Sequence, residues 1–395
     1  MKRLAFVVPR YGENVLGGAE TLAREMAQHL VAANIAQVEV FTTCATSHLT
    51  WQNDLPATSS VEQGVVVHRF PVASRQGTLQ NPTNLAMRLI QYDALTRDEQ
   101  LDWVAQSVHS PELYAALDQR IAQFDLVFLI PYLFGTTFYA STLCPDRTII
   151  WPCLHDEVYA QLDITRELLL TARGILFNSN AEAALAKRLY GFSHPIAQTV
   201  GVGFDPLPEI DQSRFRRKYG ITQPFMLYSG RLESPKNVDL LIDYFCRYSE
   251  RNHQDSPFKL VLMGEGPVNV PDQPEIIKVG FQSTQREKHE AFASASVLCQ
   301  PSTNESFSIV MMEAWQHGKP VLVNQYCDVT REHVTQSNGG LWFADYAEFE
   351  AMLDVFAAND QLCNQLGRNG QRYVQQNYTW SAVLKRFENA LQLWS

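Results

Sequence analysis

The chain has 395 residues, of which 46% are hydrophobic and 19% are charged, and this ordinary globular composition excludes wholesale disorder. At roughly 150 residues per domain, the length predicts two or three domains and excludes a single small binding module. The formal net charge of −10 argues against a protein that binds the phosphate backbone of nucleic acids.

The seven cysteines contain no Cys-x-x-Cys pair, which indicates reduced thiols rather than a disulfide framework or a zinc site. Only a short apolar run, 4–8, follows Lys2-Arg3, and this is too short for a signal peptide. No apolar run approaches 18 residues. We therefore expect a cytoplasmic protein with at most peripheral contact with the inner face of a membrane.

In the first half of the chain, short apolar runs alternate with stretches of helical period. We expect a helix at 19–33 and strands at 4–8, 38–42, 65–70, 126–130, 148–151 and 174–178. This alternation predicts βαβ units and a parallel sheet. The polar, helix-prone segment 78–112 is interpreted as an insertion or cap on that sheet.

A second series of the same kind follows a break rich in glycine and proline at 201–206, where we place a hinge. Its expected strands are 225–228, 259–263, 276–279, 297–300 and 320–323, and 380–395 is expected to be an amphipathic helix. We predict an α/β fold of two doubly wound, Rossmann-like domains, 1–203 and 204–379, that face one another across a cleft. The last helix, 380–395, is expected to pack back on the first domain. Ligands of such sheets bind beyond the carboxyl ends of the strands.

The first loop ends in Gly17-Gly18-Ala19-Glu20 and leads directly into a helix, whose free amides could bind a phosphate. A glycine turn required only by backbone geometry explains the same residues. The loop lacks the Gly-x-Gly-x-x-Gly spacing of dinucleotide folds.

Two cations, Arg231 and Lys236, follow the expected strand that ends at Gly230. A guanidinium and an ammonium group over a strand end suit a diphosphate. The alternative is two solvated surface cations. The loop is not a Walker P-loop, because no second glycine precedes the lysine.

Two glutamates lie eight residues apart, Glu305 and Glu313, on either side of an expected helix start near 306–308. Glu305 is then in the loop, and the amides of Phe307, Ser308 and Ile309 point outward. One carboxylate could bind sugar hydroxyls and the other a ribose, with phosphate at the amides between them. The alternatives are a helix-dipole contact for Glu305 and a solvated helix face for Glu313.

The order and spacing of these motifs resemble the retaining GT-B glycosyltransferases of family 4, the glycosyl transferases group 1. The resemblance covers essentially the whole chain. It rests on 17–20, 155–157, 177–180, 201–205, 230–231, 236–237, 262–267, 279–281 and the pair Glu305 and Glu313.

The resemblance implies a role for each matching residue. Lys236 and Arg231, helped by Gly17 and Gly18, would hold the diphosphate of the donor. Glu305 would face the donor sugar and Glu313 the ribose. Further donor-binding positions would be Ser306, Phe307, Ser308 and Ile309 at the phosphate and Val279, Gly280 and Phe281 near the base. His155 would approach the donor sugar and the reacting centre, which makes His155 and Glu305 the expected catalytic residues.

The implied reaction transfers a hexosyl group from a nucleotide diphosphate sugar to an acceptor hydroxyl with retention, in surface polysaccharide or glycoconjugate assembly. The expected partners are the donor and a glycan or lipid-linked acceptor, without nucleic acid. The motifs supply no carboxylate nucleophile, which fits attack by the acceptor on the face that the diphosphate leaves. No Asp-x-Asp pattern occurs, so we expect neither a metal ion nor another cofactor.

Three alternatives to this function remain. A GT-B-type sugar-nucleotide epimerase shares the diphosphate site but needs no acceptor. A non-catalytic sugar-nucleotide binder or partner subunit could use the same fold. An NAD-dependent oxidoreductase is disfavoured by the missing glycine fingerprint.

Overall fold

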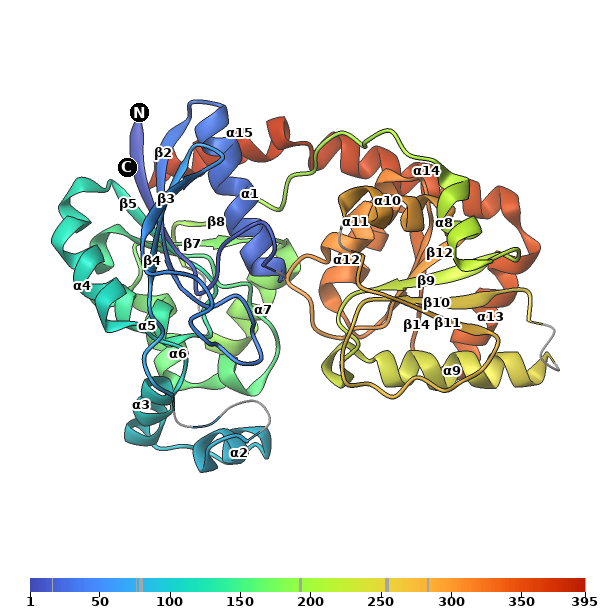
Figure 1. The fold of residues 1–395 in the computed structure, drawn as a ribbon, viewed down its shortest axis with the longest axis horizontal. Coiled ribbons are helices and arrows are strands. Elements are labelled where there is room, and N and C mark those ends of the chain that lie inside the picture. The colour runs from blue at the N-terminus through green and yellow to red at the C-terminus, as the bar shows by residue number, and fades with distance from the viewer. Residues whose placement is uncertain are drawn as a thin grey trace. The chain divides into compact units, whose positions relative to one another are not determined.

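The chain forms two compact units, which are shown in Figure 1. The first unit contains residues from Met1 to Gly203 and the chain from Trp380 onward, and the second runs from Phe204 to Thr379. The computed structural model describes residues 1–15, 17–75, 77, 81–191, 194–252, 256–282 and 284–394. Residues 78–80 of the expected insertion and Ser395 of the expected last helix lie outside this description.

The first unit is built on a sheet with the strand order β3-β4-β2-β1-β5-β6-β7-β8. All neighbouring strands are parallel except β3 and β4. The strands are β1 (Lys2–Val7), β2 (Ala36–Thr43), β3 (Ser59–Glu62), β4 (Val65–Phe70), β5 (Leu126–Leu129), β6 (Thr148–Ile150), β7 (Gly174–Phe177) and β8 (Ala197–Thr199). The helices are α1 (Gly18–Ala32), α2 (Asn84–Ile90), α3 (Arg97–Gln106), α4 (Pro111–Arg120), α5 (Gly135–Ser141), α6 (Asp163–Thr171), α7 (Asn180–Tyr190) and α15 (Trp380–Leu393).

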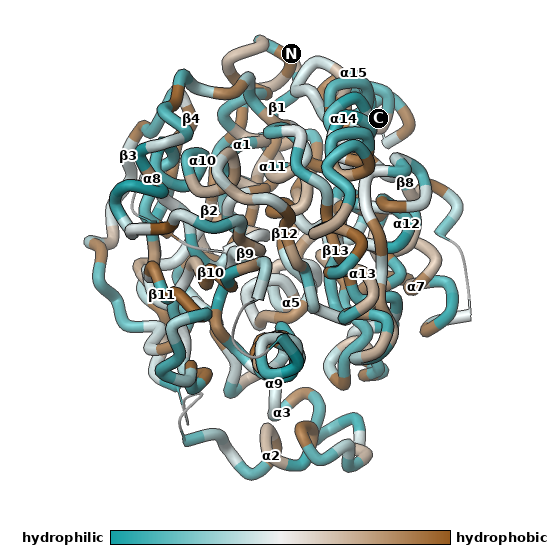
Figure 2. The backbone as a smooth tube through the Cα atoms, turned by 90° about the vertical axis from the view of Figure 1, so that its right-hand side faces the viewer, coloured by the Kyte–Doolittle hydropathy of each residue, from teal (hydrophilic) through white to brown (hydrophobic). Residues whose placement is uncertain are grey.

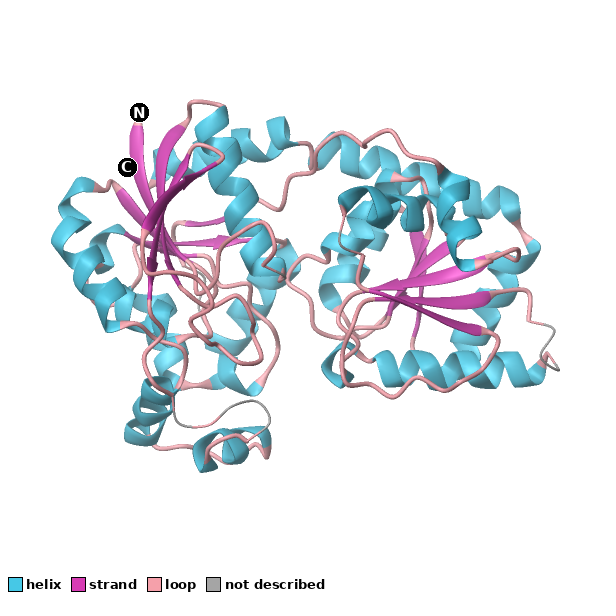
Figure 3. Cartoon of the chain, viewed as in Figure 1, coloured by secondary structure: helices cyan, strands magenta, loops and turns pink. Residues whose placement is uncertain are grey.

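The second unit is built on a fully parallel sheet with the order β11-β10-β9-β12-β13-β14. Its strands are β9 (Phe225–Ser229), β10 (Lys259–Met263), β11 (Ile276–Gly280), β12 (Val297–Gln300), β13 (Val321–Asn324) and β14 (Gly340–Phe343). Its helices are α8 (Gln212–Tyr219), α9 (Val238–Arg251), α10 (Gln285–Ser294), α11 (Ile309–Gln316), α12 (Asp328–Ser337), α13 (Tyr346–Ala358) and α14 (Asp360–Asn377). Within each unit, helices flank the strands on both faces (Figure 3). The α/β fold class predicted from the sequence is therefore confirmed.

Burial explains why the central strands are continuous apolar runs. Every residue of β5, β6, β7, β9, β12 and β13 is buried, because helices cover both faces of the sheet. Figure 2 shows hydrophobic residues along strands such as β10 and β12, whereas the visible turns of α9 are mostly hydrophilic. Three strands without this pattern, β3, β8 and β14, are missing from the sequence prediction.

The segment expected to be an insertion forms α2 and α3 and the start of α4. Helix α3 begins with a capping box in which Thr96 and Glu99 satisfy one another's backbone N–H groups. Its buried face contributes to a small apolar cluster that also includes Leu162 and Ile164 at the start of α6. The segment is therefore part of the first unit, where it packs beside the start of α6.

The topology of the second sheet fixes where a ligand site can form. From β9 the chain proceeds to β10 and β11 on one side, and it then returns to β12 on the other side of β9. The loops after β9 and β12 therefore diverge at a switch point, where open α/β sheets bind ligands.

The chain passes between the units at two places that lie next to one another. Phe204 pairs with Thr379 in an isolated parallel bridge, and a Cβ added to Gly203 would overlap the Trp380 ring. Trp380 also stacks on His29 of α1, with 3.8 Å between the ring centroids. Helix α15 therefore packs on the first unit. Within the described residues, no helix has the length and apolar character that a bilayer span requires.

Candidate functional site

The loops that follow β9 and β12 are joined by an ion pair. Lys236 Nζ lies 2.7 Å from Glu305 Oε1 and donates a second hydrogen bond to the carbonyl oxygen of Asn304 at 3.3 Å. Asn237, in the left-handed conformation at the start of α9, donates its side-chain amide to the carbonyl oxygen of Pro301 at 3.1 Å. The structure thus brings together two residues that the sequence places 69 positions apart.

A buried glutamine at the end of β12 supports this pair. Gln300 Nε2 donates to Glu305 Oε1 at 3.2 Å and to Ser308 Oγ at 3.3 Å. Its own Oε1 is buried and has no partner among the described residues. Sequence reasoning missed Gln300, although a polar residue at the end of an otherwise apolar strand is a usable signal.

Helix α11 begins with free backbone donors. Ser308 is its N-cap residue and has a left-handed conformation with φ of 68°, which is uncommon outside glycine. No described residue accepts a hydrogen bond from the N–H groups of Phe307, Ser308 or Ile309. These groups and the positive end of the helix dipole form a site suited to an anion. Ser306 lies just before it, in the loop after Glu305.

An aromatic platform fixes the loop that carries these donors. The buried ring of Phe307 contacts the rings of His333 and Tyr378, with centroids 5.1 and 5.0 Å away. Burial lowers the pKa of His333 to about 3, so this ring is neutral at physiological pH. The side chain of Phe307 is therefore part of the core, and only its backbone is available to a ligand.

Glu313 lies in α11 and is 6% exposed, so the solvated-face alternative for this residue is wrong. Its Oε1 accepts a hydrogen bond from Lys288 Nζ of α10 at 2.5 Å. Its Oε2 is buried and has no partner among the described residues. Sequence reasoning missed Lys288, because nothing distinguishes it from the other charged residues of α10.

The two expected diphosphate cations differ in their surroundings. The Lys236 side chain is 20% exposed, whereas that of Arg231 is 51% exposed and pairs with Glu233 at 3.0 Å. The solvated-cation alternative thus describes Arg231 and does not describe Lys236. The structure does not bring Arg231 to the Glu305 carboxylate.

Glycines allow the strand ends beside this site to approach closely. Gly264 has φ of 144°, and a Cβ added to it would lie 2.9 Å from the carbonyl carbon of Gly230 and overlap its oxygen. The Gly264 N–H donates to the carbonyl oxygen of Gly280, at the end of β11. The carbonyl oxygen of Val279 accepts from Gln282 Nε2 at 3.0 Å, and the Phe281 ring is exposed. Phe281 therefore leaves an aromatic face free at this edge of the sheet.

The glycine turn expected to bind phosphate lies in the first unit, where it wraps around a buried ion pair. Gly17 is the N-cap residue of α1, and Gly18 is the first residue of this helix. Arg10 donates to Glu20 at 2.5 Å, and a Cβ added to Gly17 would overlap the Glu20 carboxylate. Sequence reasoning missed Arg10. Gly17 is required here because the Glu20 carboxylate lies too close for any side chain at this position.

His155 also belongs to the first unit, where it lies on the segment after β6 and is partly buried. Its carbonyl oxygen accepts from the N–H of Glu157 at 3.1 Å. The Glu157 carboxylate in turn accepts from the Tyr132 hydroxyl at 2.8 Å.

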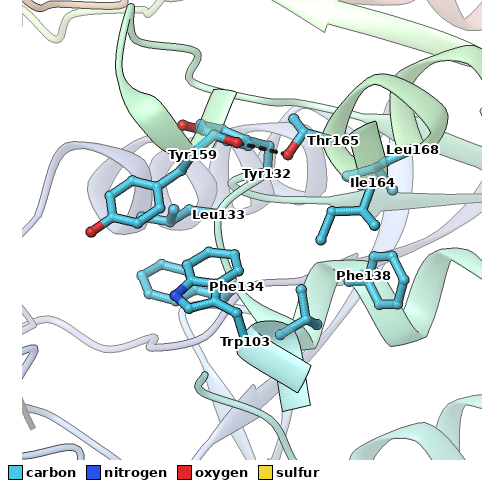
Figure 4. A pocket seen from close by; sticks show the side chains of 10 residues that line it. Trp103, Tyr132, Leu133, Phe134, Phe138, Tyr159, Ile164, Thr165 and Leu168 are labelled. Carbon is cyan, nitrogen blue, oxygen red and sulfur yellow. Dashed lines mark hydrogen bonds between the residues drawn. The ribbon is translucent and has the colours of Figure 1, made fainter. Parts of the chain in front are cut away.

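The first unit also contains a pocket lined largely by aromatic side chains, Tyr132 among them (Figure 4). The rings of Trp103 and Tyr159 stack there with 5.2 Å between their centroids. The Thr165 hydroxyl donates to the carbonyl oxygen of Tyr159 at 2.8 Å. Trp103 comes from α3, so the expected insertion supplies one wall of the pocket.

The expected donor-binding residues of the second unit fall within one family match. Residues 211–373 match the family Glycosyl transferases group 1. The second unit is a glycosyl transferases group 1 domain.

Two relatives are similar to larger parts of the chain. An uncharacterized glycosyltransferase from Methanocaldococcus jannaschii is 24% identical over 46% of this chain, and the aligned part spans 49% of that relative. D-inositol 3-phosphate glycosyltransferase from Kribbella flavida is 25% identical over 79% of this chain and 75% of its own length.

Solved structures share the fold of both units. Sucrose-phosphate synthase from Thermosynechococcus elongatus has a TM-score of 0.73 at 16% identity, covering 100% of this chain and 99% of that chain. The Anabaena protein HepE, solved in complex with UDP and glucose, has a TM-score of 0.69 at 19% identity, covering 99% and 100%. The fold is thus GT-B, with two Rossmann-like domains, as the sequence predicted.

The group 1 domain contains most of the expected donor-binding residues. Lys236, Glu305 and the amides at the start of α11 belong to one connected set, which Gln300 completes. Within the described part of the chain, no three His, Cys, Asp or Glu side chains are grouped so that they could hold a metal ion.

Proposed function

We propose that this chain is a retaining glycosyltransferase of family 4 that transfers a hexosyl group from a nucleotide diphosphate sugar to an acceptor hydroxyl. The observation that carries this proposal is the group 1 domain in which Lys236 meets Glu305 beside the free amides of α11. Three groups in this pair of loops match a sugar diphosphate. The ammonium group suits the negative charge of the diphosphate, the carboxylate suits the sugar hydroxyls, and the free amides suit the phosphate oxygens.

The donor is held by this chain's own cations and dipoles. The N–H groups of Phe307, Ser308 and Ile309 bind phosphate oxygens, and Lys236 moves from Glu305 to the diphosphate. Arg231 joins it from the surface, and the glycine turn at Gly17 and Gly18 assists. Glu305 is thereby released to accept hydrogen bonds from the sugar, while the unpartnered Oε2 of Glu313 accepts one from the ribose. Phe281 stacks on the base. We infer that no metal ion is needed for this binding.

The transfer proceeds on one face of the sugar. The bond between the anomeric carbon and the phosphate oxygen breaks, and the acceptor oxygen bonds to the same face of that carbon. The acceptor proton passes to the leaving diphosphate. His155 contacts the donor sugar during this step, and Glu305 stabilises the positive charge that develops on the ring. The proposed acceptors are glycan hydroxyls, free or lipid-linked, in surface polysaccharide or glycoconjugate assembly.

A binding panel tests this proposal. Because solved structures with this fold were obtained with UDP and UDP-glucose, these are the first ligands to measure by calorimetry, beside GDP, ADP and NAD. We expect one nucleoside diphosphate and its sugar to bind equally well in Mg²⁺ and in EDTA. Loss of binding in EDTA would refute metal independence. Binding of NAD instead would refute the transferase, and a changed free sugar nucleotide without acceptor would identify an epimerase.

Replacing Lys236 with methionine is expected to weaken binding of the nucleoside diphosphate by about 10- to 100-fold. The substitution removes one charge-assisted hydrogen bond, which contributes about 1.5–3 kcal/mol. Lys218→Met is the matched control, since Lys218 forms an exposed pair with Glu287 in the same unit. Calorimetry of both variants checks the prediction, and equal affinities for K236M and K218M would remove Lys236 from the site.

A further inference from the structure

A fully buried carboxylate joins two segments of the first unit. Glu182 lies in the first turn of α7 and is 0% exposed. One of its oxygens accepts the N–H of Leu154 at 2.6 Å, and the other accepts the N–H of Asn178 at 2.6 Å. Leu154 immediately precedes His155, so this carboxylate is bonded to the segment that carries the histidine.

The same segment is attached to the end of β7 at two further points. The Trp151 indole N–H donates to Asn178 Oδ1 at 2.8 Å, and Asn178 Nδ2 donates to Cys153 Sγ at 3.6 Å. Cys153 has φ of 52°, a left-handed conformation that costs about 1–2 kcal/mol outside glycine. A strained turn directly before His155 is therefore held by Glu182 and Asn178.

Helix capping alone does not account for Glu182. The side chain of Ser179 already caps α7, because its hydroxyl accepts the Glu182 N–H at 3.1 Å. In a capping box the glutamate at this position accepts the N–H of the N-cap residue. Glu182 also interacts with the Ser179 N–H, but its short hydrogen bonds are to the N–H of Asn178, before the cap, and to the N–H of Leu154. Burial raises the pKa of Glu182, whereas the N–H groups of Asn178, Leu154 and Ser179 favour its charged form.

We infer that Glu182 is a positioning residue for His155: its two hydrogen bonds fix the backbone of the 151–155 turn and thereby the place of the imidazole. This inference rests on the proposed function, in which His155 contacts the donor sugar. A group that acts through the histidine affects the transfer step and leaves nucleotide binding in the second unit unchanged.

The test is a double-mutant cycle with Glu182→Gln and His155→Ala, measured with the donor and acceptor found for the wild type. The glutamine amide accepts one N–H and faces the other with its own donor, so the turn loses one anchor. We expect E182Q to lower kcat by 10- to 50-fold with the Kd for the nucleoside diphosphate unchanged. In the H155A background, E182Q is expected to have less than a twofold effect, because residues that act through one another are not additive. Thr83→Ala, which removes the cap of α2 in the same unit, is the control and keeps its kcat.

An equal effect of E182Q in both backgrounds, or an unchanged kcat, would overturn the inference. If E182Q does not fold, Glu182→Asp is used instead, since the shorter side chain cannot span both N–H groups. A second readout needs no activity: amide exchange at Leu154 and the NMR signals of the His155 ring should change in E182Q and stay unchanged in T83A. A wild type without transferase activity would refute the proposed function, while unchanged exchange and ring signals would refute the role of Glu182 by themselves.

Discussion

Replacing Glu305 with glutamine is expected to lower turnover by about 100-fold or more while changing nucleotide affinity by less than about threefold. Loss of one group that stabilises developing charge typically costs a factor of about 10² to 10³. Glu305 is suited to this role, because Gln300 holds one of its oxygens when Lys236 has moved to the diphosphate and its side chain is largely buried. Glutamine keeps the size but removes the negative charge, and its amide group faces the Lys236 ammonium.

Steady-state kinetics and calorimetry on the same preparation separate the two effects. Glu287→Gln is the control, since Glu287 forms an exposed ion pair with Lys218 in the same unit. A variant E305Q that loses nucleotide affinity as strongly as turnover would show that Glu305 organises the phosphate site rather than the sugar. Normal turnover would exclude it from the reaction.

Replacing Gly264 with alanine is expected to lower the free energy of unfolding by about 4 kcal/mol or more. The added methyl group would overlap the carbonyl oxygen of Gly230, and φ of 144° is unfavourable for any L residue. For a unit of this size, such a loss lowers Tm by roughly 8–16 °C. Nucleotide affinity should fall as well, because Gly230 begins the loop that carries Lys236.

Gly220→Ala is the control that measures backbone strain alone, without the steric overlap that Gly264→Ala introduces. Gly220 has φ of 66°, and no heavy atom lies within 4 Å of an added Cβ. This variant is expected to lose about 1 kcal/mol from the left-handed conformation alone. Thermal unfolding checks both variants, and a G264A variant as stable as G220A would mean that the two loops do not meet as described.

The sequence predicts the interior of both sheets well and their margins poorly. A strand such as β12, covered on both faces, must be apolar throughout, so its pattern is unambiguous. The edge strand β3 has the sequence Ser-Ser-Val-Glu and pairs only with β4, so it needs no apolar run. Strand β14 places Trp342 at the surface, which breaks the expected pattern. Fully buried strands can therefore be predicted locally, whereas edge strands depend on a neighbour.

Site residues that follow from the local sequence can be predicted. Site residues that come together from separate elements cannot be predicted from the local sequence. Glu305 and the start of α11 follow from local sequence. Gln300 and Lys288 approach the two glutamates from other elements, and no local pattern reports that contact. The sequence gives no reason to distinguish Arg231 from Lys236 as a diphosphate-binding cation. The short 3-10 turn Ser234–Lys236 and the left-handed Asn237 direct only the lysine to Glu305.

The paired crossings between the units have an evolutionary consequence. Because the chain leaves the first unit at Gly203 and re-enters it at Trp380, and because these residues are adjacent, the second unit is topologically a cassette inserted into the first. Insertions whose two ends lie close together are readily exchanged between proteins. Under the proposed function, recombination at these two junctions would replace the donor specificity of such an enzyme in a single event and leave acceptor recognition to the host unit.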